Sequence, residues 1–184
     1  MSHHWLLWDS NSITCCHRRF WSRTYTAYFY FRDPWQRLVS AYINKAVEYN
    51  YSRILHTPCK WERMKPYKAD ITFKQFLECI AHGSRDVHWT PQWKLCSFCS
   101  ISYDYIGHLE TVKNDAAQVL QHLDINLTYP QIFSSKMHKE LSTWYADLPA
   151  KLLRQIFTLF KYDFLLHGYD SAPPGREDIF TDAS

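Results

Sequence analysis

Three side chains of this sequence are candidates for chemistry on an anion: Arg32, Ser40 and His88. An arginine guanidinium can bind phosphate through two parallel hydrogen bonds, and a serine hydroxyl can add one more. A histidine whose pKa is near neutrality can take a proton from an attacking hydroxyl. These residue types suit an anion-binding site with a general base, if the fold positions them for it.

A strand that runs into a helix would position the first two side chains. Residues 26–31 are rich in aromatics and too short for a globular helix, so they predict a buried strand. Asp33 suits a helix N-cap, Pro34 the first helical position and Gln36 the capping-box partner. Apolar residues then recur on one helix face: Trp35, Leu38, Val39, Tyr42 and Ala46. The polar residues off that face are Gln36, Arg37, Ser40 and Asn44.

A helix that begins directly after a strand is a favourable place for an anion. Its first N–H groups lack partners and carry partial positive charge. Ligands of open α/β sheets bind at the carboxyl ends of strands, where Arg32 would lie. An ordinary capped helix, with Arg32 in a surface ion pair, explains the same residues and stays open on physical grounds.

The segment from Arg32 to Tyr42 (Arg-Asp-Pro-Trp-Gln-Arg-Leu-Val-Ser-Ala-Tyr) closely resembles the 3′-phosphate-binding segment of Golgi carbohydrate sulfotransferases. It is most similar to the chondroitin/dermatan 4-O-sulfotransferase group. The resemblance implies that Arg32 and Ser40 contact the 3′-phosphate of the donor, 3′-phosphoadenosine 5′-phosphosulfate. It also implies that Asp33 and Pro34 shape the corner, by which we mean the sharp turn from the strand into the helix. The donor-binding segment that it implies includes Arg37.

Two later segments carry the same resemblance. His88-Trp89-Thr90-Pro91, a Cys-x-x-Cys at Cys96 and Cys99, and residues 103–111 follow the order and spacing of the family. Residues 162–169 match its closing segment, with His167 in place of an aromatic. The resemblance covers residues 26–170.

The implied fold is α/β: a P-loop-like, three-layer nucleotide-binding fold whose central parallel sheet is flanked by helices, here incomplete at its N-terminus. Residues 1–24 are unassigned, 25–170 form the partial sulfotransferase domain, and 171–184 are expected to be a disordered tail. The hydrophobic patterns predict helices over 72–81, 113–123 and 149–160, a buried strand over 103–107 and a long loop over 49–68.

The implied activity is transfer of sulfate from the donor to a glycan hydroxyl, most similar to transfer onto a chondroitin- or dermatan-type N-acetylgalactosamine. No metal is implied. His88 is the candidate catalytic base for the acceptor hydroxyl. A structural histidine bonded to a backbone carbonyl beside Trp89 is the alternative, and Glu110 and Asp104 are rival bases.

Relatives also carry an upstream loop, with a Lys beside Thr or Ser, that cradles the 5′-phosphosulfate. No such unit is recognisable in residues 1–24, and no Lys precedes Lys45. We expect a truncated sequence without this loop or its membrane anchor. The alternative is a catalytically dead relative that only binds nucleotide or glycan. A P-loop phosphotransferase is disfavoured because no Gly-x-x-x-x-Gly-Lys-Ser/Thr run is present.

Composition narrows the class further. The 46% hydrophobic content argues against disorder over these 184 residues. The net charge of +3, without a basic run beyond residues 17–19, does not suggest a nucleic-acid partner. A glycosaminoglycan or glycoprotein glycan is the partner that the resemblance implies.

Six cysteines are compatible with disulfides in an oxidising compartment. Half of a zinc site or a redox pair at Cys96 and Cys99 are the weaker alternatives. Sequons begin at Asn50 and Asn126. No apolar run reaches the length of a membrane span, and the first residues do not form a signal peptide. The resemblance implies a Golgi lumen location through an anchor that this sequence does not contain.

Overall fold

The computed structural model describes residues 26–48, 71–96, 101, 103–130 and 140–181. The segment 1–24 and the loop predicted over 49–68 lie outside these ranges. Contacts divide the chain into two compact units. The partial sulfotransferase domain over 25–170 stays a prediction. We call Met1–Arg32 with Gln92–Ser134 the sheet unit, and Asp33–Pro91 with Ser135–Ser184 the helical unit. Among the described residues, no helix combines the length and apolar character needed to cross a membrane.

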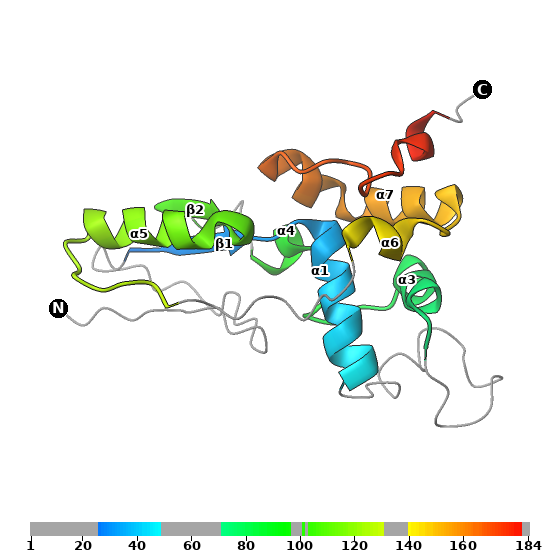
Figure 1. Ribbon diagram of the computed structural model, residues 1–184, viewed down its shortest axis with the longest axis horizontal. Coiled ribbons are helices and arrows are strands. Elements are labelled where there is room, and N and C mark those ends of the chain that lie inside the picture. Colours follow the sequence, from blue (N-terminus) through cyan, green and yellow to red (C-terminus); the bar gives the residue numbers. More distant parts are fainter. Residues whose placement is uncertain (1–25, 49–70, 97–100, 102, 131–139, 182–184) are drawn as a thin grey trace. The chain divides into compact units, whose positions relative to one another are not determined.

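The sheet unit contains two parallel strands, β1 (Tyr28–Phe31) and β2 (Tyr105–His108), with Phe31 opposite His108. A 3-10 turn, η3 (Leu109–Thr111), leads from β2 into α5 (Val112–His122), which packs on β2 (Figure 1). The short helix α4 (Gln92–Leu95) belongs to the same unit. The described chain is therefore a mixed α/β fold with a small parallel sheet, and the three-layer arrangement stays a prediction.

The second strand is less buried than the sequence predicted. A Cβ built on Gly107 would lie 2.8 Å from Asp115 Oδ2, so Gly107 faces α5. Successive side chains of a strand point to opposite faces. Ile106 therefore points away from α5, and 53% of its surface is exposed. The prediction of a buried strand over 103–107 was correct in position and wrong in burial, because α5 covers one face.

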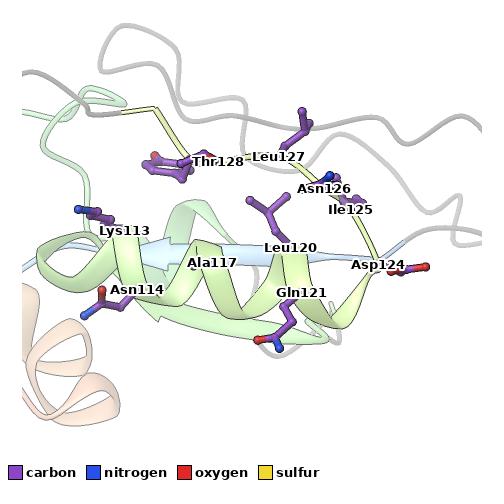
Figure 2. A pocket seen from close by; sticks show the side chains of 11 residues that line it. Lys113, Asn114, Ala117, Leu120, Gln121, Asp124, Ile125, Asn126, Leu127 and Thr128 are labelled. Carbon is purple, nitrogen blue, oxygen red and sulfur yellow. The ribbon is translucent and has the colours of Figure 1, made fainter.

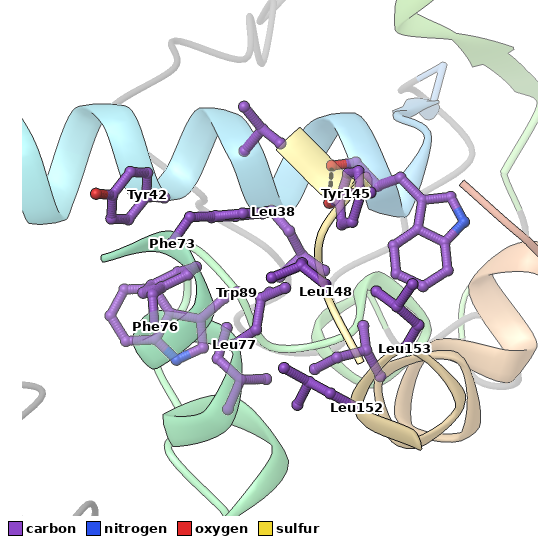
Figure 3. Close-up of a cluster of buried hydrophobic side chains, with 14 of the residues drawn as sticks. Leu38, Tyr42, Phe73, Phe76, Leu77, Trp89, Tyr145, Leu148, Leu152 and Leu153 are labelled. Carbon is purple, nitrogen blue, oxygen red and sulfur yellow. Dashed lines mark hydrogen bonds between the residues drawn. The ribbon is translucent and has the colours of Figure 1, made fainter. Parts of the chain in front are cut away.

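The helical unit begins with α1 (Pro34–Ala41), which continues as a π-helix, η1 (Tyr42–Glu48). It then contains α3 (Phe73–Ala81), α6 (Leu141–Tyr145), α7 (Ala150–His167) and a final 3-10 helix, η4 (Glu177–Phe180). Figure 3 shows the apolar side chains that these helices share. Residues without exposed surface in this core are Leu38, Val39, Phe76, Leu77, Tyr145, Leu153, Ile156, Phe164 and Ile179.

Local capping explains where the first helices begin. Asp33 Oδ1 accepts a hydrogen bond from the Trp35 N–H at 2.9 Å, and Pro34 occupies the first helical position. Thr72 caps α3 in a reciprocal capping box with Gln75. Gly83, with φ +106°, follows α3 in a conformation that suits glycine. The predicted starts of both helices are confirmed.

The C-terminal region corrects two predictions. The helix expected over 149–160 continues to His167 and ends at Gly168, whose φ is +68°. The tail expected to be disordered from residue 171 is folded through residue 181. Ile179 is fully buried in the core, and Arg176 Nη1 donates to the carbonyls of Tyr145 and Leu148, both at 2.7 Å. These long-range contacts order a segment whose composition alone suggested disorder.

Candidate functional site

The corner that carries Arg32 has the predicted local structure. Arg32 follows the last residue of β1, and Asp33 directly after it caps α1. The Arg32 backbone N–H donates to Gln92 Oε1 at 3.3 Å within the sheet unit. Arg32, Asp33 and Ser40 are each partly exposed, and Pro34 is buried. Along the chain, only Arg32 and Asp33 therefore separate the end of β1 from the start of α1. The N–H groups of a helix start can bind an anion.

Hydrogen bonds from distant parts of the helical unit hold Trp35, in the first turn of α1. Tyr145, which is labelled in Figure 3, donates its hydroxyl to the Trp35 carbonyl at 2.7 Å. Trp35 Nε1 donates to the Asp170 carbonyl at 3.3 Å. Burial, with a smaller contribution from the charge of Asp33, holds the pKa of Tyr145 well above its usual value. Tyr145 therefore stays a neutral hydrogen-bond donor to the first turn of α1.

Ser40 lies in the last turn of α1, immediately before the change to π-helix at Tyr42. π-helical turns inside longer helices occur frequently at functional sites. Lys45, in this π-helix, is 7% exposed, and its charge acts on His88. Sequence reasoning did not single out Lys45, and the helical periodicity gave no signal for it.

Arg37 does not lie on an exposed polar flank as the helical periodicity predicted. Only 4% of its surface is exposed. Arg37 Nη1 donates to the Thr90 carbonyl at 2.8 Å, and Nη2 donates to the Val87 carbonyl at 3.1 Å. A guanidinium is buried here because backbone carbonyls accept its protons. These bonds connect α1 to the loop that contains His88.

The loop around His88 is a compact turn built on Asp86. The Asp86 carboxylate accepts the His88 N–H at 2.9 Å. The Asp86 carbonyl accepts the N–H groups of Trp89, at 3.1 Å, and Thr90, at 2.7 Å. Trp89 is 1% exposed and packs edge-on against Phe76. Sequence reasoning missed Asp86, although an Asp two residues before the residue it bonds is a known turn signal.

The imidazole of His88 is biased toward its neutral form. Burial lowers its pKa, the charges of Lys45 and Arg37 lower it further, and Asp86 acts in the opposite direction. His88 Nε2 lies 3.9 Å from Asp86 Oδ1. A neutral histidine can accept a proton at neutral pH, which is the state that a general base needs.

The rival bases have different surroundings. Asp104 Oδ2 accepts the Ala27 N–H at 2.8 Å, beside the start of β1, so this carboxylate has a structural contact. Glu110 is exposed in η3. Neither residue belongs to the helical unit that contains His88.

The structure describes the oxidation state of two cysteines. Cys79 and Cys96 are both disulfide-bonded. A disulfide sulfur is not a thiolate ligand, so Cys96 does not supply half of a zinc site. Cys99 lies outside the described residues.

A pocket of about 640 Å³ lies elsewhere, between α5 and the segment that follows it (Figure 2). Its lining includes Lys113, Leu120, Gln121 and Asn126. None of the predicted site residues lines this pocket, so it is not the predicted donor site.

Along the chain, Arg32 follows the parallel strand β1 and Asp33 caps α1, and this order of elements is typical of α/β proteins that bind anions at strand ends. The family model described as the sulfotransferase family matches residues 3–170. The chain therefore belongs to the sulfotransferase family.

Curated relatives agree with this assignment. The chain is 27% identical to carbohydrate sulfotransferase 12 of Mus musculus over 183 residues, which cover 87% of this chain and 43% of the relative. It is 27% identical to carbohydrate sulfotransferase 10 of Homo sapiens over 169 residues, with 80% of this chain and 48% of the relative covered. It is 29% identical to carbohydrate sulfotransferase 14 of Danio rerio over 163 residues, covering 80% and 44%.

The chain thus spans less than half the length of these three relatives. No solved structure matches it.

Proposed function

We propose that this protein is a carbohydrate sulfotransferase that moves sulfate from 3′-phosphoadenosine 5′-phosphosulfate to a glycan hydroxyl. The observation that carries the proposal is the corner in which Arg32 joins the carboxyl end of β1 to the capped start of α1. Family membership and the names of the relatives support it. The proposal includes a three-layer nucleotide-binding fold, in which further parallel strands would extend the two-stranded sheet of β1 and β2.

The types and exposure of the residues from Arg32 to Ser40 support a site for the 3′-phosphate of the donor. Arg32 and Ser40 are partly exposed, so a guanidinium and a hydroxyl are accessible to a ligand. Asp33 and Pro34 give the helix start its shape, and the first N–H groups of α1 add partial positive charge. When bound, the donor supplies an activated sulfuryl group that an acceptor hydroxyl can attack.

His88 is the proposed base for the acceptor hydroxyl. His88 Nε2 lies 3.9 Å from Asp86 Oδ1, beyond hydrogen-bond distance, so this contact does not select one ring nitrogen as the base. The lowered pKa of His88 favours the neutral imidazole, which can take the proton from the sugar hydroxyl. A chondroitin- or dermatan-type N-acetylgalactosamine is the proposed acceptor, by resemblance of the Arg32–Tyr42 segment to the 4-O-sulfotransferase group.

A Golgi lumen location is part of the same proposal. The disulfides at Cys79 and Cys96 suit an oxidising compartment of the secretory pathway. The exposed sequon at Asn126 would be a glycan acceptor there.

Calorimetric titration with 3′-phosphoadenosine 5′-phosphate tests the donor site directly. We expect Arg32→Ala to weaken binding by about 10- to 100-fold, the value of a charge-assisted phosphate contact. Ser40→Ala should weaken it by about fivefold, since a neutral hydrogen bond is lost. Arg85→Ala is the matched control, because Arg85 bonds only to nearby carbonyls of its own segment among the described contacts.

Transfer of labelled sulfate to chondroitin and dermatan then separates an enzyme from a protein that only binds. His88→Ala in the whole protein should lower turnover by about 100-fold with donor affinity preserved. Failure of the unaltered protein to bind the nucleotide, or wild-type binding by Arg32→Ala, would refute the proposed site. Binding without transfer by the whole protein would assign it to a non-catalytic relative.

A further inference from the structure

The guanidinium of Arg37 holds both sides of the dipeptide His88-Trp89. Its two terminal nitrogens donate separately, one to the carbonyl of Val87 and one to the carbonyl of Thr90. The planar fork of arginine is suited to two acceptors at a fixed separation. Arg37 belongs to α1, and the carbonyls belong to a loop about 50 residues later in the chain.

Trp89 also anchors this loop to the core by packing against Phe76 of α3. The other hydrogen bonds that the structure describes for the loop lie within residues 86–90. Asp86 accepts the N–H groups of His88, Trp89 and Thr90 and so determines the shape of the turn. Such local bonds do not determine where the turn lies against α1. The bonds from Arg37 do, because they connect the turn to the helix whose first residues form the proposed donor site.

We infer that Arg37 is a positioning residue, which fixes the His88 loop against α1 so that the imidazole stands at a set place relative to the donor-binding helix. This inference rests on the proposed function, in which His88 takes the acceptor proton. It gives Arg37 a role through His88, in place of the donor-binding role that the resemblance implied. The burial of Arg37, at 4% exposed, agrees with a residue that is shielded from a soluble ligand.

The charges around His88 provide a readout of loop position. Lys45 acts from η1, Arg37 from α1 and Asp86 from the loop itself, while burial contributes most to the lowered pKa. A loop released from α1 would expose the imidazole, so its pKa should rise toward the usual value of about 6.5. Arg37→Lys keeps the positive charge but cannot reproduce the fork. A shift in that variant would therefore report geometry and not lost charge.

The first experiment is a titration of His88 by side-chain NMR in the 184-residue chain. In Arg37→Lys we expect the pKa of His88 to rise by about 0.5 or more. Arg85→Lys is the matched control, since Arg85 also donates to two carbonyls, those of Ile80 and Ser84, and should leave the pKa of His88 unchanged. An unchanged pKa in a folded Arg37→Lys variant would overturn the inference.

A measurement on the unaltered chain covers the case in which Arg37→Lys does not fold. Because the two Nη groups of Arg37 have different acceptors, rotation of its guanidinium should be hindered, and NMR at low temperature should resolve separate Nη signals. Arg85 donates to the Ile80 and Ser84 carbonyls from the same nitrogen, Nη1, and is the internal comparison. One averaged Nη signal for Arg37 would overturn the inference.

Kinetics of the whole protein distinguish positioning from phosphate binding. Arg37→Lys should lower kcat by about 10- to 100-fold, as expected for a misplaced catalytic group. Affinity for 3′-phosphoadenosine 5′-phosphate should stay within about twofold of the unaltered protein. A raised donor KM with unchanged kcat would contradict the inference. If the unaltered protein neither binds the nucleotide nor transfers sulfate, the proposed function fails, whereas the NMR comparison still decides whether Arg37 positions His88.

Discussion

Gly107 is the position where a single added methyl group should reveal most about the sheet that leads to Arg32. A Cβ at this position would lie 2.7 Å from Tyr30 Cε1 and 2.8 Å from Asp115 Oδ2. The Asp115 carboxylate cannot move without cost, because Oδ2 accepts the His108 N–H at 3.0 Å and the Thr111 hydroxyl at 2.7 Å. Gly107→Ala should therefore push apart β1, β2 and the start of α5.

The cost can be estimated from these contacts. Overpacking a close contact costs about 1–3 kcal/mol, and weakening a hydrogen bond to a carboxylate costs about 1.5 kcal/mol or more. We therefore expect Gly107→Ala to destabilise the sheet unit by about 2–4 kcal/mol. The ring of Tyr30 should also move. Burial and the charge of Asp115 raise the pKa of Tyr30 to about 12, so this pKa should fall when the ring moves away from both.

Native-state hydrogen exchange of the β1 and β2 amides is the appropriate assay, because it measures the local free energy of opening in this unit. Gly83→Ala is the matched control. Gly83 has open space around its Cβ position and a φ of +106°, so alanine there should cost about 1–2 kcal/mol from backbone strain alone, at the end of α3. Exchange of the strand amides in Gly107→Ala within about 0.5 kcal/mol of the unaltered chain would refute the packing argument.

Two further changes test the helical unit. The pKa of His88 is lowered in the folded chain, so its contribution to stability is fully present above the unfolded pKa of about 6.5 and is lost as the pH falls through that value toward the folded pKa. The free energy of unfolding in urea, measured between pH 7.5 and pH 5, should show this loss, and His88→Gln should make this free energy less dependent on pH. The same dependence on pH in His88→Gln as in the unaltered chain would contradict the lowered pKa of His88. Arg176→Ala removes bonds to three carbonyls of the turn after α6 and should cost about 2 kcal/mol, with faster hydrogen exchange around Ile179. Arg176→Lys should lose less, and equal stability of both variants with the unaltered chain would show that the final segment is held by packing alone.

Local features of the fold were predictable because they depend on near neighbours in the chain. Asp33 and Thr72 cap their helices as their spacing indicated, since a cap bonds N–H groups two or three residues away. The apolar residues that recur on one face of α3 are buried as their spacing indicated. On the helix predicted over 113–123, Ala116, Val119 and Leu120 are buried, whereas Ala117 is exposed and Leu123 is partly buried. The resemblance to the sulfotransferase family was also visible in the sequence, and the family match confirms it.

Long-range contacts account for the misses. The composition of residues 171–184 suggested disorder, yet Ile179 finds a place in the core and Arg176 finds carbonyls near residue 146. Ile106 was expected to be buried, but α5 packs on the opposite face of its strand. A sequence pattern indicates which residues can be buried, while the neighbouring elements determine which ones are.

By itself, the sequence determined the family, the capped helix start that follows Arg32, and the strands and helices near residues 28, 72, 105, 113 and 150. Only the tertiary structure decided that Arg37 turns inward to hold the His88 loop, that Asp86 shapes this loop, and that Lys45 acts on its imidazole. The physical reason is that burial of a guanidinium requires hydrogen-bond acceptors, and those of Arg37 are carbonyls about 50 residues away in the chain. No local pattern contains that information.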